Sequence, residues 1–140
     1  MTTFHASQEI SATPAAVFAA FEDPARLARW WGPEGFRNTF TVCEFKPGGQ
    51  WTFTMHGPDG TNYPNEAVFA EIEPDRKVVI DHSCQPLFRL TVELLPSAIG
   101  TRVTWAQAFA DPVVAEAVRH IVEPANRQNL ARLAAEVAAT

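Results

Sequence analysis

The chain of 140 residues has the length expected of one domain, residues 1–140. Its 46% hydrophobic and 19% charged residues are typical of a globular protein. A net charge of -5 argues against nucleic acid as a partner, because that affinity depends on neutralising phosphates. Ten Phe, four Trp and one Tyr are many for this length, and they indicate large apolar walls within the fold.

The absence of several sequence motifs limits the cellular compartments and the cofactors that we expect for this protein. No apolar run approaches the roughly 18 residues that span a bilayer, and residues 1–10 contain no secretory signal. Cys43 and Cys84 form neither a CxxC motif nor a disulfide framework, and no glycine-rich phosphate-binding motif occurs. We therefore expect a cytoplasmic protein with reduced thiols, no membrane insertion and no cofactor.

The first third of the chain predicts one strand followed by two short helices. Residues 4–11 alternate in polarity, which predicts a strand with one buried face. Thr13-Pro14 and Asp23-Pro24 each join an N-cap residue to a proline suited to the first helical position, so a helix begins at each. Residues 32–35, rich in Gly and Pro, end the second helix.

The middle of the chain changes to a period of two, which predicts strands. Short turns separate them, and short connections require antiparallel neighbours. Residues 111–140 return to helical spacing, and Pro124 is expected to kink or break that helix near Glu123 because it removes a hydrogen bond. The expected strands are 36–45, 50–56, 65–73, 77–83, 88–95 and 102–109.

These elements predict an α+β fold. A curved antiparallel sheet of about seven strands wraps on the long C-terminal helix, and two short helices follow the first strand. Alternation assigns the inner face most clearly in 88–95, and a one-residue bulge would reverse part of any such set. The side chains expected to face the helix are Trp51, Phe53, Met55, Val68, Ala70, Ile72, Val78, Ile80, His82, Phe88, Leu90, Val92, Leu94, Val103, Trp105, Gln107 and Phe109.

Three polar residues fall on this apolar inner face: Glu66, His82 and Gln107. Burying them without partners would cost a few kcal/mol each. One interpretation places them near open strand ends, in contact with water. Another makes them the polar groups of an apolar ligand pocket. A third makes Glu66 and His82 a coupled acid-base pair.

Two further features have alternative interpretations. His82 and Cys84 could lie on one side of a strand as metal ligands, but zinc needs three or four ligands and no partner pair has suitable spacing. We therefore expect no metal site. Trp30 and Trp31 either anchor the second helix beneath the sheet or place one ring at the lip of a cavity.

Several motifs together resemble the START-like (helix-grip) superfamily, and within it the domains homologous to the C-terminal part of the activator of Hsp90 ATPase. The resemblance covers almost the whole chain. It implies a helix-grip fold with a deep cavity between sheet and long helix, suited to lipids, polyketides or other hydrophobic molecules. The motifs are residues 10–18 (ISATPAAVF), 29–33 (RWWGP), 48–51 (GGQW), 56–66 (HGPDGTNYPNE), 71–76 (EIEPDR) and 126–133 (NRQNLARL).

Three functions follow as hypotheses. The first is a cytosolic binding protein for a small hydrophobic molecule, lipid-like or aromatic, rather than an enzyme. The second is an enzyme of the polyketide cyclase, aromatase or hydrolase type that uses Glu66 and His82 as acid and base. The third is an interaction module for an Hsp90-type chaperone or a stress response. An exposed edge strand or helix could also form a homodimer. The residues expected to contact a ligand are Trp51, Phe53, Met55, Glu66, Val68, Ile80, His82, Leu90, Trp105, Gln107 and Ile121.

Overall fold

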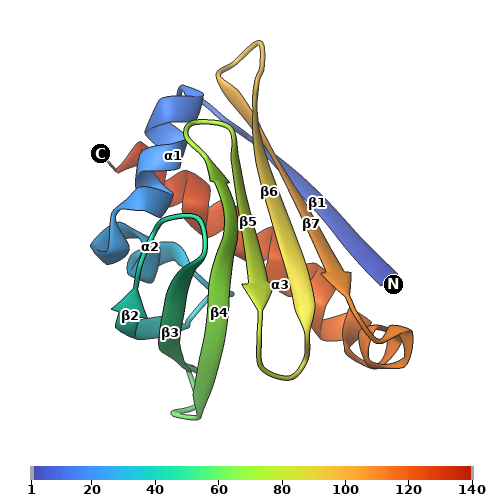
Figure 1. The fold of residues 1–140 in the computed structure, drawn as a ribbon. Helices are drawn as coiled ribbons and strands as arrows, with labels where there is room; N and C mark the ends of the chain where they lie inside the picture. Colours follow the sequence, from blue (N-terminus) through green and yellow to red (C-terminus); the bar gives the residue numbers. More distant parts are fainter. Residues whose placement is uncertain (1, 140) are drawn as a thin grey trace.

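A single antiparallel sheet wraps around the longest helix of the chain in the computed structural model, which describes residues 2–139 (Figure 1). Over these residues the sheet has seven strands in the order β1-β7-β6-β5-β4-β3-β2, and α3 crosses one face of it while α1 and α2 pack near the C-terminal end of α3. The helices and strands are β1 (Thr2–Ile10), α1 (Pro14–Glu22), α2 (Pro24–Trp30), β2 (Arg37–Cys43), β3 (Gly49–His56), β4 (Asn62–Glu73), β5 (Lys77–His82), β6 (Phe88–Pro96), β7 (Thr101–Phe109) and α3 (Pro112–Ala138).

Each of the three helices begins where a capping side chain precedes a proline. The Thr13 hydroxyl accepts from the backbone N–H of Ala16 at 3.2 Å, and the Asp23 carboxylate accepts from that of Ala25 at 2.9 Å. Asp111 caps α3 in the same way. The proline at the first helical position gives up only an N–H that the helix leaves unpaired. The helix starts predicted from Thr13-Pro14 and Asp23-Pro24 are confirmed.

The long helix α3 continues through Pro124, so a break near Glu123 does not occur, while a kink there stays a prediction. Proline removes the hydrogen bond to the carbonyl of His120, and that residue is exposed, where water can take the place of the missing donor. Buried residues lie on both sides of the proline, Ala115 before it and Leu130 after it. Packing at both ends therefore holds the helix together. Within the described residues, no helix is both long and apolar enough to cross a membrane.

Much of the aromatic content forms a solid core between the sheet and the two short helices. Trp51 is fully buried and stacks on Phe53 and Phe69, with ring centroids 4.2 and 5.2 Å apart. Trp31 meets the Trp51 ring edge-on at 5.0 Å. Trp30 is also buried, and its indole N–H donates to a backbone carbonyl of α1. Such stacked and edge-to-face pairs stabilise a core beyond the area they bury.

Most of the predicted inner faces are confirmed. Because the strands alternate regularly, the residues assigned to β3, β5, β6 and β7 lie on the side of the sheet that faces α3. Met55 and Phe88 are only partly buried, since they lie where the interior opens. The buried members of the predicted set are Trp51, Phe53, Val78, Ile80, His82, Leu90, Val92, Leu94, Val103, Trp105, Gln107 and Phe109.

Strand β4 departs from simple alternation because it contains a bulge. Its register against β5 shifts between Phe69 and Glu71, which leaves Ala70 as the extra residue. Phe69 and Ile72 therefore both pack against the core although they are three positions apart. Alternation counted back from Ile72 therefore assigns the residues of β4 before the bulge to the wrong face of the sheet.

This phase error overturns the predicted orientation of Glu66, Val68 and Ala70. Ala67 is the residue of β4 that lies opposite His82, and cross-strand partners share a face of the sheet. Ala67 is buried, whereas Glu66 is exposed and Val68 is only partly covered. Glu66 and Val68 thus point to the opposite face from His82.

Candidate functional site

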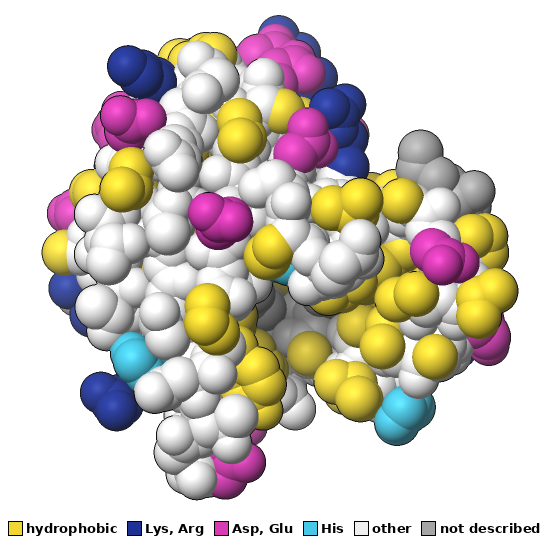
Figure 2. Space-filling view, turned by 60° about the horizontal axis from the view of Figure 1, so that its bottom comes forward, with side chains coloured by type: hydrophobic (Ala, Val, Ile, Leu, Met, Phe, Trp, Pro, Cys, Tyr) yellow, Lys and Arg dark blue, Asp and Glu magenta, His cyan; other side chains and the backbone are white. Residues whose placement is uncertain are grey.

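A pocket of about 300 Å³ lies between α3 and the inner face of the sheet. Figure 2 shows it as a hollow with hydrophobic side chains around its rim. Its lining comes from β3 to β7, from the segment after α2, and from the middle of α3. This size is at the lower end of the range for small-molecule sites.

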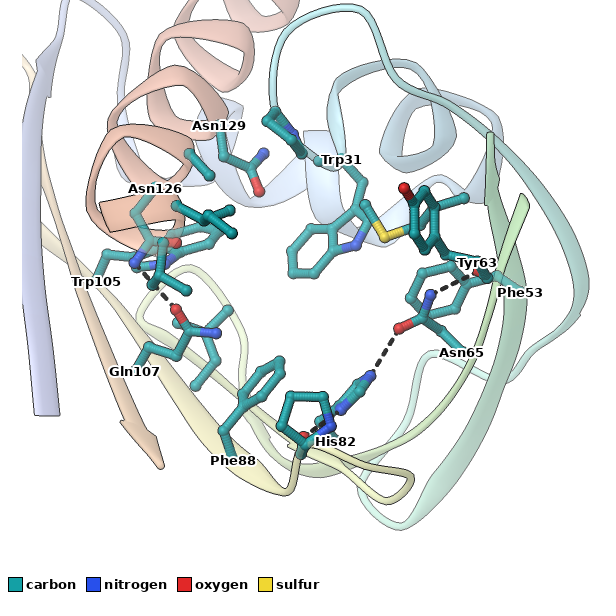
Figure 3. A pocket seen from close by; sticks show the side chains of 18 residues that line it. Trp31, Phe53, Tyr63, Asn65, His82, Phe88, Trp105, Gln107, Asn126 and Asn129 are labelled. Atoms are coloured by element: carbon teal, nitrogen blue, oxygen red, sulfur yellow. Dashed lines mark hydrogen bonds between the residues drawn. The ribbon is translucent and has the colours of Figure 1, made fainter. Parts of the chain in front are cut away.

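The walls of the pocket are mostly apolar. Trp31 projects into the space between the side of the pocket formed by α3 and β7 and the side formed by β3 and β4 (Figure 3). Its ring centroid lies 5.8 Å from that of Trp105. Ile121 is 60% exposed and stands at the edge of the opening. Apolar surface that the fold leaves uncovered here would be buried by a hydrophobic ligand. The apolar lining residues are Trp31, Pro33, Phe53, Met55, Pro86, Phe88, Leu90, Trp105, Ile121, Val122 and Ala125.

One polar group of the lining is built around His82, at the end of β5. Its Nδ1 lies 2.8 Å from the carbonyl oxygen of Pro86, and its Nε2 lies 2.6 Å from Oδ1 of Asn65. The Asn65 amide in turn donates to the carbonyl of Tyr63 at 2.8 Å. The imidazole also stacks on the Phe88 ring, with centroids 4.5 Å apart. Contacts on both nitrogens and on its face hold the ring in one orientation.

Burial and hydrogen bonding act in opposite directions on this histidine. Burial lowers the pKa of His82, because the imidazolium loses hydration, and this is the larger effect. The nearby Pro86 carbonyl raises the pKa, but by less. Burial therefore disfavours the charged form of the ring, and a neutral imidazole donates to only one of the two oxygens that lie beside its nitrogens.

The second polar group lies across the pocket, where β7 meets α3. Asn126 donates through Nδ2 to Oε1 of Gln107 at 3.0 Å, as Figure 3 shows. One helical turn on, Asn129 donates to the backbone carbonyl of Trp30 at 3.0 Å. All three amide side chains are buried, at 9% exposed or less.

A guanidinium behind the wall fixes the segment that carries Trp31. The pKa of Arg132 is lowered by burial, yet a guanidinium keeps its charge in proteins. Its planar fork spreads its donors over acceptors on two sides, whereas a lysine would concentrate three donors at one point. The carbonyls that accept from Arg132 are those of Trp31, Gly32 and Pro33 through Nη1, and those of Arg29 and Phe36 through Nη2, at 2.7–3.1 Å.

The predicted ligand residues divide into three groups. Trp51 and Ile80 are buried in the solid core and do not line the pocket. Glu66 and Val68 lie on the outer face of the sheet, so the proposed acid-base pair of Glu66 and His82 does not form. The predicted residues that line the pocket are Phe53, Met55, His82, Leu90, Trp105, Gln107 and Ile121.

The sequence interpretation also missed several lining residues. Asn65 was missed because the bulge in β4 shifted the phase by one. Asn126 and Asn129 lie among the buried positions of α3, so two amides within an apolar helical stripe were a signal that could have been used. For Trp30 and Trp31 the structure combines both alternatives, with Trp30 in the core and Trp31 in the pocket wall.

Cys84 is close to His82 but does not line the pocket. Its Sγ lies 3.5 Å from His82 Nε2 and 3.4 Å from the backbone nitrogen of Glu66. Within the described residues, no group of three or more His, Cys, Asp or Glu side chains could hold a metal ion. The pair is therefore two ligands short of a tetrahedral zinc site.

The fold and the pocket together define a START-like, helix-grip domain, in which a curved antiparallel sheet holds a long C-terminal helix with an opening between them. Residues 11–138 match the family described as Activator of Hsp90 ATPase homolog 1-like protein, and the chain belongs to that family. Among curated proteins, none matches this sequence.

Solved structures from bacteria share this fold over nearly the whole chain. A protein of Arthrobacter aurescens, determined in solution by NMR, is 27% identical with a TM-score of 0.88, covering 99% of this chain and 87% of that one. A protein of Nitrosomonas europaea is 18% identical with a TM-score of 0.86, covering 98% and 94%. The AHSA1 protein of Silicibacter pomeroyi is 23% identical with a TM-score of 0.79, covering 99% of both chains. The last two establish likeness of fold alone.

Proposed function

We propose that this protein is a cytosolic binding protein for a small hydrophobic molecule, aromatic or lipid-like, held between the sheet and α3. The observation that carries the proposal is a pocket of about 300 Å³ whose walls are mostly aromatic and aliphatic and whose few polar groups converge from two sides. Pockets that bind small molecules have this composition, and open apolar space inside a fold is otherwise costly.

Binding is favoured over catalysis by the chemistry that lines the pocket. The carboxylate proposed as a catalytic partner, Glu66, lies on the other face of the sheet. The lining histidine, His82, is engaged by Pro86 and Asn65 on its two nitrogens. A general base must be able to reach the proton that it removes, and both nitrogens of this imidazole lie against groups of the protein itself.

A thermal-shift screen with apolar aromatic compounds and lipids tests the proposal. A ligand that binds only the folded state stabilises it by about 2.7 kcal/mol at a hundredfold excess over Kd, a readily measured rise in Tm. Ala125→Trp fills the pocket from α3 and should abolish the rise for every compound that produces one.

The matched control is Ala117→Trp, which makes the same change at an exposed position of the same helix and should leave the rise intact. Should no compound raise Tm, or should the Ala125→Trp protein respond like the unmodified one, the pocket is not a ligand site.

A further inference from the structure

The amide side chains of the pocket differ in how far the protein itself satisfies them. His82 and Asn65 contact one another and backbone carbonyls. Asn129 donates to the backbone of α2, and within the described residues nothing bonds to its Oδ1. Gln107 and Asn126, by contrast, share a single hydrogen bond. Within residues 2–139, nothing bonds to Nε2 of Gln107 or to Oδ1 of Asn126.

The number of free donor and acceptor groups on this amide pair does not depend on how the two amides are oriented. Turning both by 180° exchanges their roles, but one NH₂ group and one carbonyl oxygen still remain open. Both side chains are buried, at 9% and 8% exposed, and both line the pocket. Nε2 of Gln107 and Oδ1 of Asn126 are not among the fully buried atoms that lack a partner, so both reach the open space of the pocket, where a ligand with complementary groups can bond to them. Nε1 of Trp105, another lining residue, is fully buried and lacks a partner among the described residues.

No charged side chain stands ready to pair with an ionic ligand. None of the lining residues is Asp, Glu, Lys or Arg. The guanidinium of Arg132 lies behind the pocket wall, close to Gly32: its Nη1 is 3.8 Å from the position that a Cβ on Gly32 would take. Nη1 and Nη2 already donate to five backbone carbonyls. Burial lowers the pKa of His82 and so disfavours a positive charge on its ring. A carboxylate or ammonium group in this pocket would therefore lose hydration without gaining a counter-charge.

We infer that the ligand is an uncharged small aromatic molecule with a hydroxyl or carboxamide group that pairs with Gln107 and Asn126. The inference rests on the proposed function, since it concerns the occupant of the same pocket. A hydroxyl or carboxamide both accepts and donates, so it can take a hydrogen from Gln107 and give one to Asn126. A fatty acid, although apolar over most of its length, gains no cationic partner here, so we expect it to bind more weakly than an uncharged ligand.

Four probes that share one ring system test this inference: naphthalene, 2-naphthol, 2-naphthamide and 2-naphthoate. Their Kd values are measured by isothermal titration calorimetry with the full chain at pH 7.5. We expect 2-naphthol and 2-naphthamide to bind at least tenfold more tightly than naphthalene and at least tenfold more tightly than 2-naphthoate.

Two variants locate the polar contact. Gln107→Met should bring the affinity for 2-naphthol down to that for naphthalene and leave the naphthalene affinity within about twofold of its original value. Asn126→Leu should do the same and provides a second reading if the first variant does not fold. The matched control, Gln50→Met, makes the same change at an exposed position of β3 and should alter neither affinity.

The outcomes separate this inference from the proposed function. If 2-naphthoate or naphthalene binds as tightly as 2-naphthol, the inference of an uncharged polar ligand is refuted, while the proposed function of the apolar pocket is retained. The uncharged polar ligand is likewise refuted if Gln107→Met and Asn126→Leu both retain the full preference for 2-naphthol. If none of the four probes binds, the inference fails, and the thermal-shift screen with the Ala125→Trp protein decides separately whether the proposed function stands.

Discussion

Replacing Arg132 by methionine removes the guanidinium that ties α3 to the segment between α2 and β2. Methionine keeps an unbranched side chain of similar length, so the change removes mainly the charge and the donors. In the native protein this one side chain donates to five backbone carbonyls between residues 29 and 36. Two of these carbonyls have a second donor: Asn38 donates to that of Trp31, and the backbone N–H of Phe36 donates to that of Pro33.

The expected cost is about 3 kcal/mol. A hydrogen bond to a charged group contributes roughly 1.5–3 kcal/mol, but the five contacts share one guanidinium and some of the freed carbonyls reach water, so the contributions do not add. With an unfolding entropy of about 2.1 cal/mol/K per residue, 3 kcal/mol corresponds to a fall in Tm of about 10 °C for a chain of 140 residues. Because the same segment carries Trp31, ligand affinity should fall as well.

Urea denaturation of the Arg132→Met and Arg132→Lys proteins measures this effect. Lysine keeps the charge but concentrates its donors at one point, so it should recover less than half of the loss. Arg127→Met, at an exposed position of the same helix, is the control and should cost less than about 0.5 kcal/mol. Full recovery by lysine, or a loss below about 1 kcal/mol for Arg132→Met, would refute the assigned role of the planar fork.

Two further variants probe the backbone of the pocket wall and the titration of its histidine. Gly32→Ala should destabilise the fold by about 1–2 kcal/mol in urea denaturation, because Gly32 has φ of +94° and an added Cβ would lie 2.8 Å from Met55 Cε; Gly48→Ala, at φ of +80° with open space around it, should cost less. Burial places the folded pKa of His82 below its unfolded value of about 6.5. Between these two values the unfolded chain binds more protons, so stability falls as pH falls below about 6.5. His82→Gln should flatten this slope between pH 7.5 and 5, and an unchanged slope in that variant contradicts the assignment.

Local signals predicted the elements of this fold because each depends on residues close in the chain. Thr13, Asp23 and the prolines that follow them specify helix starts through side-chain caps and a fixed backbone angle. The alternation in β6 and β7 specifies their inner faces, because side chains of a strand point to opposite sides in turn. The family resemblance placed these elements in the correct overall architecture.

The candidate site was predicted only in part, because it depends on which face of the sheet each side chain takes and on how far that side chain lies from α3. A single extra residue at Ala70 turned Asn65 inward and Glu66 outward, and no local pattern marks a bulge of that kind. The sequence also does not show whether an inward side chain lies in the core or beside the pocket. Trp51 and Phe53 share a face of one strand, yet Trp51 lies in the core and Phe53 lines the pocket. Alternation gives the side of a strand but not the distance to the helix above it.

By itself, the sequence determined an acidic α+β domain with a curved antiparallel sheet, a long C-terminal helix and an interior rich in aromatic residues. Only the tertiary structure decided which of those residues fill the core and which surround open space. The reason is that a pocket exists only where side chains from separate elements fail to meet, as Trp31, Phe88 and Asn126 do here. The same long-range packing left Gln107 and Asn126 with one hydrogen bond between them and free groups that a ligand can use.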